Sequence, residues 1–217
     1  MQIYNTLNEM MTNKLAVVIR GNNQITAQKT AIACAKGGIK TLEITFTIPG
    51  ALDLIKSLKD YDNLVIGAGT VLDSETARVA ILAGAEFIVS PSFDEATAKL
   101  CNRYGALYFP GCMTVNEMIR AAEFGVSIIK LFPSIAFNPS IIEDLKGPLP
   151  HINIMPTGGV SFENANRWLE SGAVMLGIGG EITRPGKNKD YEKVTQLAKE
   201  FLKLIRKDVN VVSKKKS

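Results

Sequence analysis

Histidine and cysteine are scarce in this chain. Its 217 residues include one histidine and three cysteines, none of which forms a CxxC pair. Because Cys34, Cys101 and Cys112 stand far apart, the sequence predicts neither a disulfide framework nor a zinc site. His151 precedes an expected strand, far from where a barrel would place its chemistry. We therefore expect no metal site and no cofactor.

Long apolar runs and a strong net charge are also missing. The sequence contains no run of about 18 apolar residues, which is the length needed to cross a bilayer. The stretch MQIYNTLNEMMTNK lacks the apolar core of a secretory signal, so we expect a cytoplasmic location. The formal net charge is only +4, and no basic stripe interleaves with aromatic residues. The expected partner is a small molecule, not a membrane or a nucleic acid.

Strand-like and helix-like segments alternate along most of the chain. Hydrophobic residues make up 46% of it, and short apolar runs rich in β-branched residues alternate with helix-like segments. Asp73 and Thr114 are expected helix N-caps. The predicted strands are eight: LAVVIR, TLEITF, VIGAGT, FIVSP, LYFPG, IIKLFP, NIMPTGG and VMLGIGG.

Eight βα units without a linker-like tract predict an α/β fold, a single closed (β/α)₈ TIM barrel over residues 1–217. Residues 1–13 are expected to form a helix that closes the bottom of the barrel. The last helix is expected to span about 190–206, and residues 208–217 form a frayed basic tail. The alternative is a doubly wound open sheet, but IRGNN after the first strand is no glycine-rich dinucleotide loop.

One lysine interrupts the apolar strand IIKLFP. Side chains alternate in direction along a strand, so Lys130 and Phe132 share one face. The same alternation places Glu43 and Thr47 on one face of TLEITFT, and this polar face must point into the barrel. The two strands are the second and sixth, so their inward residues can share a layer. We expect Lys130 and Glu43 to converge.

The chemistry of such a pair depends on burial. Desolvation lowers the pKa of a lysine, and a neutral amine can attack a ketone to form a Schiff base. The carboxylate opposite can then move protons. A structural ion pair is the alternative, but desolvation offsets most of its attraction. Because barrel active sites lie at the C-terminal ends of strands, the pattern favours a catalytic role for Lys130 and Glu43.

Glycines follow the last two predicted strands, in MPTGGV and LGIGGEI. Barrels often bind phosphate there through backbone N–H groups, although the glycines could serve only as tight turns. The candidate residues are Gly158, Gly159, Gly179 and Gly180. Arg20 and Thr70 end the first and third strands, and Arg20 is a natural partner for a carboxylate or phosphate, or for a salt bridge at the rim.

Taken together, the motifs resemble those of the 2-keto-3-deoxy-6-phosphogluconate (KDPG) aldolases, also called 4-hydroxy-2-oxoglutarate (KHG) aldolases. These are class I, Schiff-base aldolases. The resemblance runs through AVVIRGNN, GGIKTLEITFTIPGA, IGAGTVLD, AGAEFIVSPSF, YFPGCMT, IIKLFP and MPTGGV. It implies that Lys130 forms the imine with the C2 ketone of a 2-keto acid, that Glu43 is the general acid/base, and that the enzyme is a metal-independent homotrimer.

The resemblance also implies which residues surround the imine. It implies that Arg20 and Thr70 meet the pyruvate-derived half, and that Pro91, Gly111 and Phe132 shape the pocket. Thr157, Gly158 and Gly159 would hold the phosphate. The chain departs from a common pattern at Thr47, where many members carry arginine, and after the eighth strand. There a serine hydroxyl often faces the phosphate, and this chain has Gly180 followed by Glu181.

The expected reaction is cleavage of a 2-keto-3-deoxy-6-phospho sugar acid to pyruvate and glyceraldehyde 3-phosphate. The gluconate compound, its galactonate epimer and 4-hydroxy-2-oxoglutarate, which gives pyruvate and glyoxylate, remain alternatives. Rival classes are a phosphosugar isomerase or epimerase and a non-catalytic phosphosugar-binding barrel. Whether Cys112 touches the substrate stays open.

Overall fold

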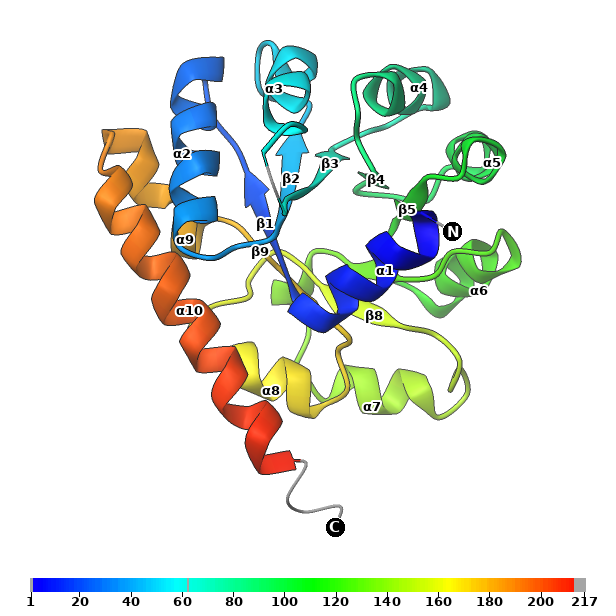
Figure 1. The fold of residues 1–217 in the computed structure, drawn as a ribbon. Helices are drawn as coiled ribbons and strands as arrows, with labels where there is room; N and C mark the ends of the chain where they lie inside the picture. Colours follow the sequence, from blue (N-terminus) through cyan, green and yellow to red (C-terminus); the bar gives the residue numbers. More distant parts are fainter. Residues whose placement is uncertain (1, 62, 213–217) are drawn as a thin grey trace.

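Parallel strands form a ring with helices on its outside (Figure 1). The computed structural model describes residues 2–61 and 63–212. Its strands are β1 Leu15–Ile19, β2 Thr41–Thr45, β3 Val65–Gly69, β4 Phe87–Val89, β5 Leu107–Phe109, β6 Gly111–Cys112, β7 Ile129–Leu131, β8 Ile154–Pro156 and β9 Leu176–Ile178. Each of the eight predicted strands is present, and the fifth is divided into β5 and β6.

The ring is built from two sheets. One has the order β5-β4-β3-β2-β1-β9 and the other β6-β7-β8. Pro110 separates β5 from β6 because proline has no N–H to donate to a ladder. Its carbonyl still accepts a hydrogen bond from the backbone N–H of Lys130, at 2.9 Å. A single parallel bridge from Thr157 to Gly177 joins β8 to β9, so the barrel closes.

Each outer helix follows a strand. The helices are α1 Gln2–Asn13, α2 Gln24–Lys36, α3 Ala51–Leu58, α4 Ser74–Leu82, α5 Glu95–Tyr104, α6 Val115–Glu123, α7 Ile141–Lys146, α8 Ala165–Glu170, α9 Gly180–Thr183 and α10 Tyr191–Val212, with 3₁₀ turns η1 Ser134–Ala136 and η2 Arg184–Asn188. Asp73 caps α4, and Thr114 forms a capping box with Glu117 at α6. Both predicted N-caps are confirmed.

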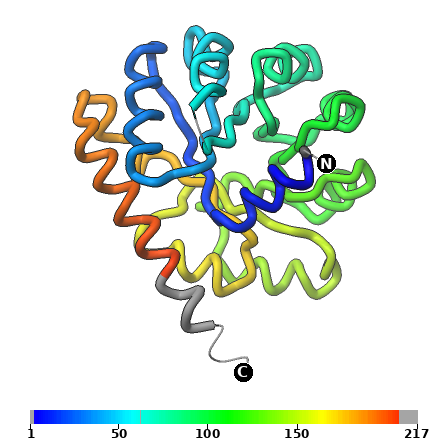
Figure 2. The backbone as a smooth tube through the Cα atoms, viewed as in Figure 1, coloured from blue at the N-terminus to red at the C-terminus, as the bar shows by residue number. Residues whose placement is uncertain are grey.

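Helix α10 lies on the outer side of the barrel, whereas α1 lies across one of its ends (Figure 2). Helix α1 crosses the bottom of the barrel, where the fully buried Met10 contacts the interior. Helix α10 continues to Val212, past residue 206, so residues 208–212 are helical and not a frayed tail. Residues 213–217 of the expected tail lie outside the described residues. In the part of the chain that is described, no helix is long and apolar enough to cross a membrane.

Two hydrophobic layers hold the fold together. The inner layer fills the lower barrel and includes Phe87, Phe109 and Ile128. The outer layer lies between strands and helices and includes Ile129 and Leu131. Neighbouring residues of the strand around Lys130 thus point to opposite layers, as alternation predicts. The packed lower layer leaves the polar chemistry to the C-terminal ends of the strands.

Candidate active site

Lys130 and Glu43 meet inside the barrel. Lys130 lies on β7 and is 3% exposed, and Glu43 lies on β2 and is 1% exposed. The Nζ atom of Lys130 stands 3.9 Å from Oε1 of Glu43. Strand alternation therefore turned both side chains inwards, and the barrel brings them to one place.

The two groups do not form a tight structural ion pair. A separation of 3.9 Å is too long for a hydrogen bond. Among the described residues, no group hydrogen-bonds to either carboxylate oxygen of Glu43. The Nζ atom of Lys130 is 4.8 Å from the centre of the Phe132 ring. Buried polar atoms without partners are costly, so this arrangement is typical of a site that receives a ligand.

The electrostatics favour a neutral amine at Lys130. Burial is the largest effect and lowers the pKa of Lys130 below its ordinary value, because the charged form loses hydration. The charge of Glu43 raises this pKa, and the positive charge of Arg20 lowers it. The net shift is downward. A larger fraction of Lys130 is therefore the nucleophilic amine than for an exposed lysine at the same pH.

Two glycines make room for the buried polar side chains, and sequence reasoning did not assign them this part. A Cβ at Gly69, on β3 beside β2, would overlap the carboxylate of Glu43. A Cβ at Gly177, on β9, would overlap the hydroxyl of Thr157. The signal in the sequence was a glycine at an inward strand position, which points to close approach of another group.

A cavity of about 390 Å³ lies next to the pair. Lys130 and Glu43 do not line it, but Phe132 does, and the centre of its ring is 4.8 Å from Nζ of Lys130. Seven predicted site residues line it: Arg20, Phe132, Thr157, Gly158, Gly159, Gly179 and Gly180. The hydroxyl of Thr157 is buried and has no hydrogen-bond partner within the described chain. Arg20 belongs to no ion pair of the described residues, so it is not engaged at the rim. A cation and a buried hydroxyl thus face one space, and Phe132 separates this space from the Lys130 amine.

Other predicted residues lie beside this cavity without lining it. Thr47 is exposed in the turn after β2, where its hydroxyl pairs with that of Thr45 at 2.9 Å. This hydrogen bond keeps the Thr47 hydroxyl beside Thr45, on the face of β2 that carries Glu43, although β2 itself ends at Thr45. A contact between Thr47 and the substrate stays a prediction. Thr70 follows β3 with a φ of 57°, which is strained for a β-branched residue.

Pro91 and Gly111 contact each other. A Cβ at Gly111 would overlap the backbone carbonyl of Pro91, and Gly111 is in register with Lys130 across β6 and β7. The glycine thus lets β6 approach the loop after β4 next to the lysine. This packing supports the strand that carries the amine.

Metal and thiol chemistry find no support in the described residues. No group of three His, Cys, Asp or Glu side chains there could hold a metal ion. Cys34, Cys101 and Cys112 are buried and free. Burial raises the pKa of each thiol to about 12, which leaves them unreactive at neutral pH.

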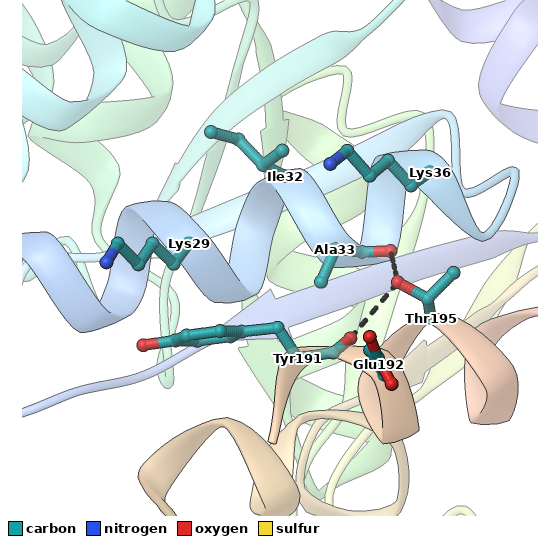
Figure 3. A pocket seen from close by; sticks show the side chains of 7 residues that line it. All are labelled: Lys29, Ile32, Ala33, Lys36, Tyr191, Glu192 and Thr195. Atoms are coloured by element: carbon teal, nitrogen blue, oxygen red, sulfur yellow. Dashed lines mark hydrogen bonds between the residues drawn. The ribbon is translucent and has the colours of Figure 1, made fainter. Parts of the chain in front are cut away.

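A second hollow lies on the outer surface, between α2 and α10 (Figure 3). Its volume is about 420 Å³, and Lys29, Lys36 and Tyr191 line it. The Nζ atom of Lys29 is 5.9 Å from the centre of the Tyr191 ring. The hydroxyl of Thr195 on α10 donates a hydrogen bond to the backbone carbonyl of Ala33 on α2. None of the candidate catalytic residues is near it, so the chemistry belongs to the barrel interior.

Comparison with known proteins decides the family. The sequence profile described as KDPG and KHG aldolase matches residues 7–197. The chain belongs to the KDPG and KHG aldolase family. Its relatives include the 2-dehydro-3-deoxy-6-phosphogalactonate aldolase of Escherichia coli K12, which is 33% identical over 90% of this chain and 96% of the relative. The KHG/KDPG aldolase of the same strain is 32% identical over 78% of this chain and 82% of the relative.

A solved structure of the family shows the same fold. The KDPG aldolase from Legionella pneumophila, with pyruvate captured as a covalent carbinolamine intermediate, has a TM-score of 0.83 and 25% identity. The match covers 90% of this chain and 97% of that one. As a member of this aldolase family, the chain is a carbon–carbon lyase with a TIM-barrel-like α/β fold.

Proposed function

We propose that this aldolase acts by Schiff-base chemistry at Lys130, without a metal. The observation that carries the proposal is the buried amine of Lys130 facing the unpartnered carboxylate of Glu43 at 3.9 Å. Burial supplies the neutral nucleophile, and the carboxylate supplies a proton acceptor and donor in a site shielded from water.

The residues fit a balanced sequence of steps. The ammonium of Lys130 first passes a proton to Glu43, and the neutral amine adds to the C2 ketone. One proton shifts from nitrogen to oxygen in the adduct, and the proton held by Glu43 lets water leave to give the protonated imine. Glu43 then takes the proton of the C4 hydroxyl while the C3–C4 bond breaks, and the electron pair flows into the imine. The enamine regains a proton at C3, and water releases pyruvate from Lys130.

For the substrate, we propose a 2-keto-3-deoxy-6-phospho sugar acid, cleaved to pyruvate and glyceraldehyde 3-phosphate. Support comes from the cavity, which has Arg20 for the carboxylate and the glycines of the β8 and β9 turns for the phosphate. The similar proteins act, by name, on gluconate, galactonate and KHG substrates. We favour the gluconate compound, and KHG cleavage to pyruvate and glyoxylate is the second candidate. A cytoplasmic location remains a prediction.

Borohydride trapping tests the proposal. With saturating pyruvate, reduction should add one three-carbon unit to the intact mass, and peptide mapping should place it on Lys130. Cleavage of the gluconate, galactonate and KHG substrates is then compared by coupled assays. A wild-type chain that never gains mass would refute the Schiff base and leave the non-catalytic sugar-binding barrel.

The lowered pKa of Lys130 makes the trapping rate depend on pH in a defined way. The rate should rise as the amine deprotonates, with a midpoint below the ordinary value of 10.5. Arg20→Gln removes a positive charge that lowers this pKa, so its midpoint should move to higher pH. Trapping rates from pH 5 to 10 at saturating pyruvate measure both midpoints. An unmoved midpoint in the variant would show that Lys130 does not sense Arg20.

We also propose that the chain is a homotrimer, as the family resemblance implies. Supporting evidence is a set of exposed apolar side chains after β3, on α4, at the start of and within α6 and on η1. They are Leu72, Val79, Leu82, Met113, Val115, Ile119 and Ile135. Helix α5 lies between α4 and α6 (Figure 1). Apolar patches of this kind are rarely left open to water.

Leu82→Glu should disrupt this assembly. Leu82 is 67% exposed and shares a face of α4 with Val79, so a carboxylate there would be buried against another copy. We expect a shift from trimer to monomer in size-exclusion chromatography with light scattering. Ile25→Glu is the matched control, because Ile25 is 68% exposed on α2, away from this patch. If both variants keep the mass of the wild type, the patch is not the interface.

A further inference from the structure

The cavity next to the catalytic pair carries a cation that the site described so far does not use. Arg184 follows α9 and begins η2, and it lines the same 390 Å³ cavity as Arg20 and Thr157. Its Nη2 and Nε atoms lie 3.6 Å and 3.9 Å from where a Cβ on Gly180 would stand. The guanidinium therefore lies across Gly180 at van der Waals distance, and the absence of a side chain at this glycine leaves the space open.

No partner within the protein engages this guanidinium. The salt bridges and side-chain hydrogen bonds of residues 2–61 and 63–212 do not include Arg184. Glu181 lines the same cavity but forms no ion pair with Arg184. A guanidinium has five donors in a fixed fork that matches an anionic oxygen group. The donors of Arg184 are free to bind such a group.

The turn that carries Arg184 is held in place. A Cβ at Gly186 would overlap Thr30 of α2, so η2 packs closely against that helix. The Lys189 N–H donates to the carbonyl of Gly186, and the Asp190 N–H donates to that of Pro185. Arg184 thus projects from a fixed backbone, which favours a preorganised contact.

The position matches one end of an extended substrate. β7, β8 and β9 are neighbours in the barrel, so the end of β9 lies two strand spacings, about 10 Å, from Lys130. Between them lie Gly158 and Gly159, whose φ values are 82° and 111°. Their N–H groups donate to no backbone carbonyl of the described residues. The free donors of β8 and the free cation after β9 face the same part of the cavity.

We propose that Arg184 is a specificity-determining residue that binds the phosphate of the substrate. The Arg184 guanidinium replaces the serine hydroxyl that often faces the phosphate in this family, where this chain has Gly180. Its positive charge offsets the repulsion between Glu181 and a phosphate dianion. This proposal rests on the proposed aldolase function for its substrate. It concerns only the end of the cavity away from Lys130.

The test compares two substrates that differ by the phosphate alone. For Arg184→Ala, kcat/KM with 2-keto-3-deoxy-6-phosphogluconate should fall roughly 10- to 100-fold, mainly through KM. Cleavage of unphosphorylated 2-keto-3-deoxygluconate and trapping of pyruvate should stay within about twofold. Arg184→Lys should keep part of the preference, because it retains the charge without the fork. Lys187→Ala, an exposed cation outside the cavity, is the control and should change neither substrate.

Direct binding separates this proposal from the aldolase function. Calorimetric titration with glycerol 3-phosphate should show a Kd that weakens by a similar factor in Arg184→Ala and is unchanged in Lys187→Ala. That result in a chain that never traps pyruvate would uphold phosphate binding and refute the aldolase. Equal losses on both sugar substrates, or an unchanged Kd, would overturn the assignment of Arg184.

Discussion

Lys130→Met should lose cleavage by about 10⁵-fold or more and should give no pyruvate adduct after borohydride reduction. Methionine fills a similar volume but has no amine, so the covalent path is closed. Steady-state cleavage and intact mass measure the two effects. Lys130→Arg is the matched control, since a guanidinium keeps the positive charge but does not deprotonate to a nucleophile. It should be equally inactive.

The same variant separates catalysis from structural pairing. Removing the lysine leaves Glu43 buried, 1% exposed and without its neighbouring amine, which should lower the free energy of unfolding. The double variant Lys130→Met/Glu43→Gln should recover most of this loss in urea denaturation. It should stay inactive. A Lys130→Met protein that still cleaves substrate would mean that the lysine serves only as a structural ion pair.

Strand alternation and barrel closure explain why the central pair could be predicted from the sequence. A strand has a side-chain period of two, and a barrel assigns one face to its interior. Knowing the register of β2 and β7 was therefore enough to bring Glu43 and Lys130 together. Periodicity holds only while the strand continues, and β2 ends at Thr45, so the position of Thr47 depends on the turn and on its hydrogen bond to Thr45.

The parts that escaped prediction depend on packing between distant segments. Gly69 leaves space for the Glu43 carboxylate of the neighbouring strand, and no local pattern states which side chain will fill that space. From the sequence TRPG alone, Arg184 would be predicted to be an ordinary surface arginine. It faces the cavity only because Gly180 is bare and Gly186 fixes the turn against α2. Pro110 likewise interrupts a strand without opening the barrel, because its carbonyl still accepts a hydrogen bond from the backbone N–H of Lys130 on β7.

These features divide the site into two functional halves. The strands β2, β3 and β7 hold the amine and carboxylate in a buried layer, where small residues fix their geometry. The turns after β8 and β9 present their backbone and Arg184 to the neighbouring cavity. Under the proposed function, reaction type depends on the first half and substrate choice on the second, so substitutions in one should leave the other measurable.

Glu43→Gln should lower kcat for cleavage by about 10²- to 10⁴-fold, because the amide keeps the shape of the side chain but cannot accept the C4 hydroxyl proton. Lys130 should remain competent, since losing the negative charge of Glu43 removes an effect that raises the pKa of Lys130. More of the lysine is then a neutral amine at a given pH.

The expected signature is a split between imine formation and bond cleavage. In Glu43→Gln, the pyruvate adduct should form more slowly but still reach one equivalent on Lys130, and the midpoint of its pH profile should move to lower pH. Glu43→Asp shortens the side chain while keeping the carboxylate, so it should restore part of kcat. If Glu43→Gln cleaves as fast as the wild type, another group moves the proton. If it never forms the adduct, the carboxylate is needed first for the imine itself.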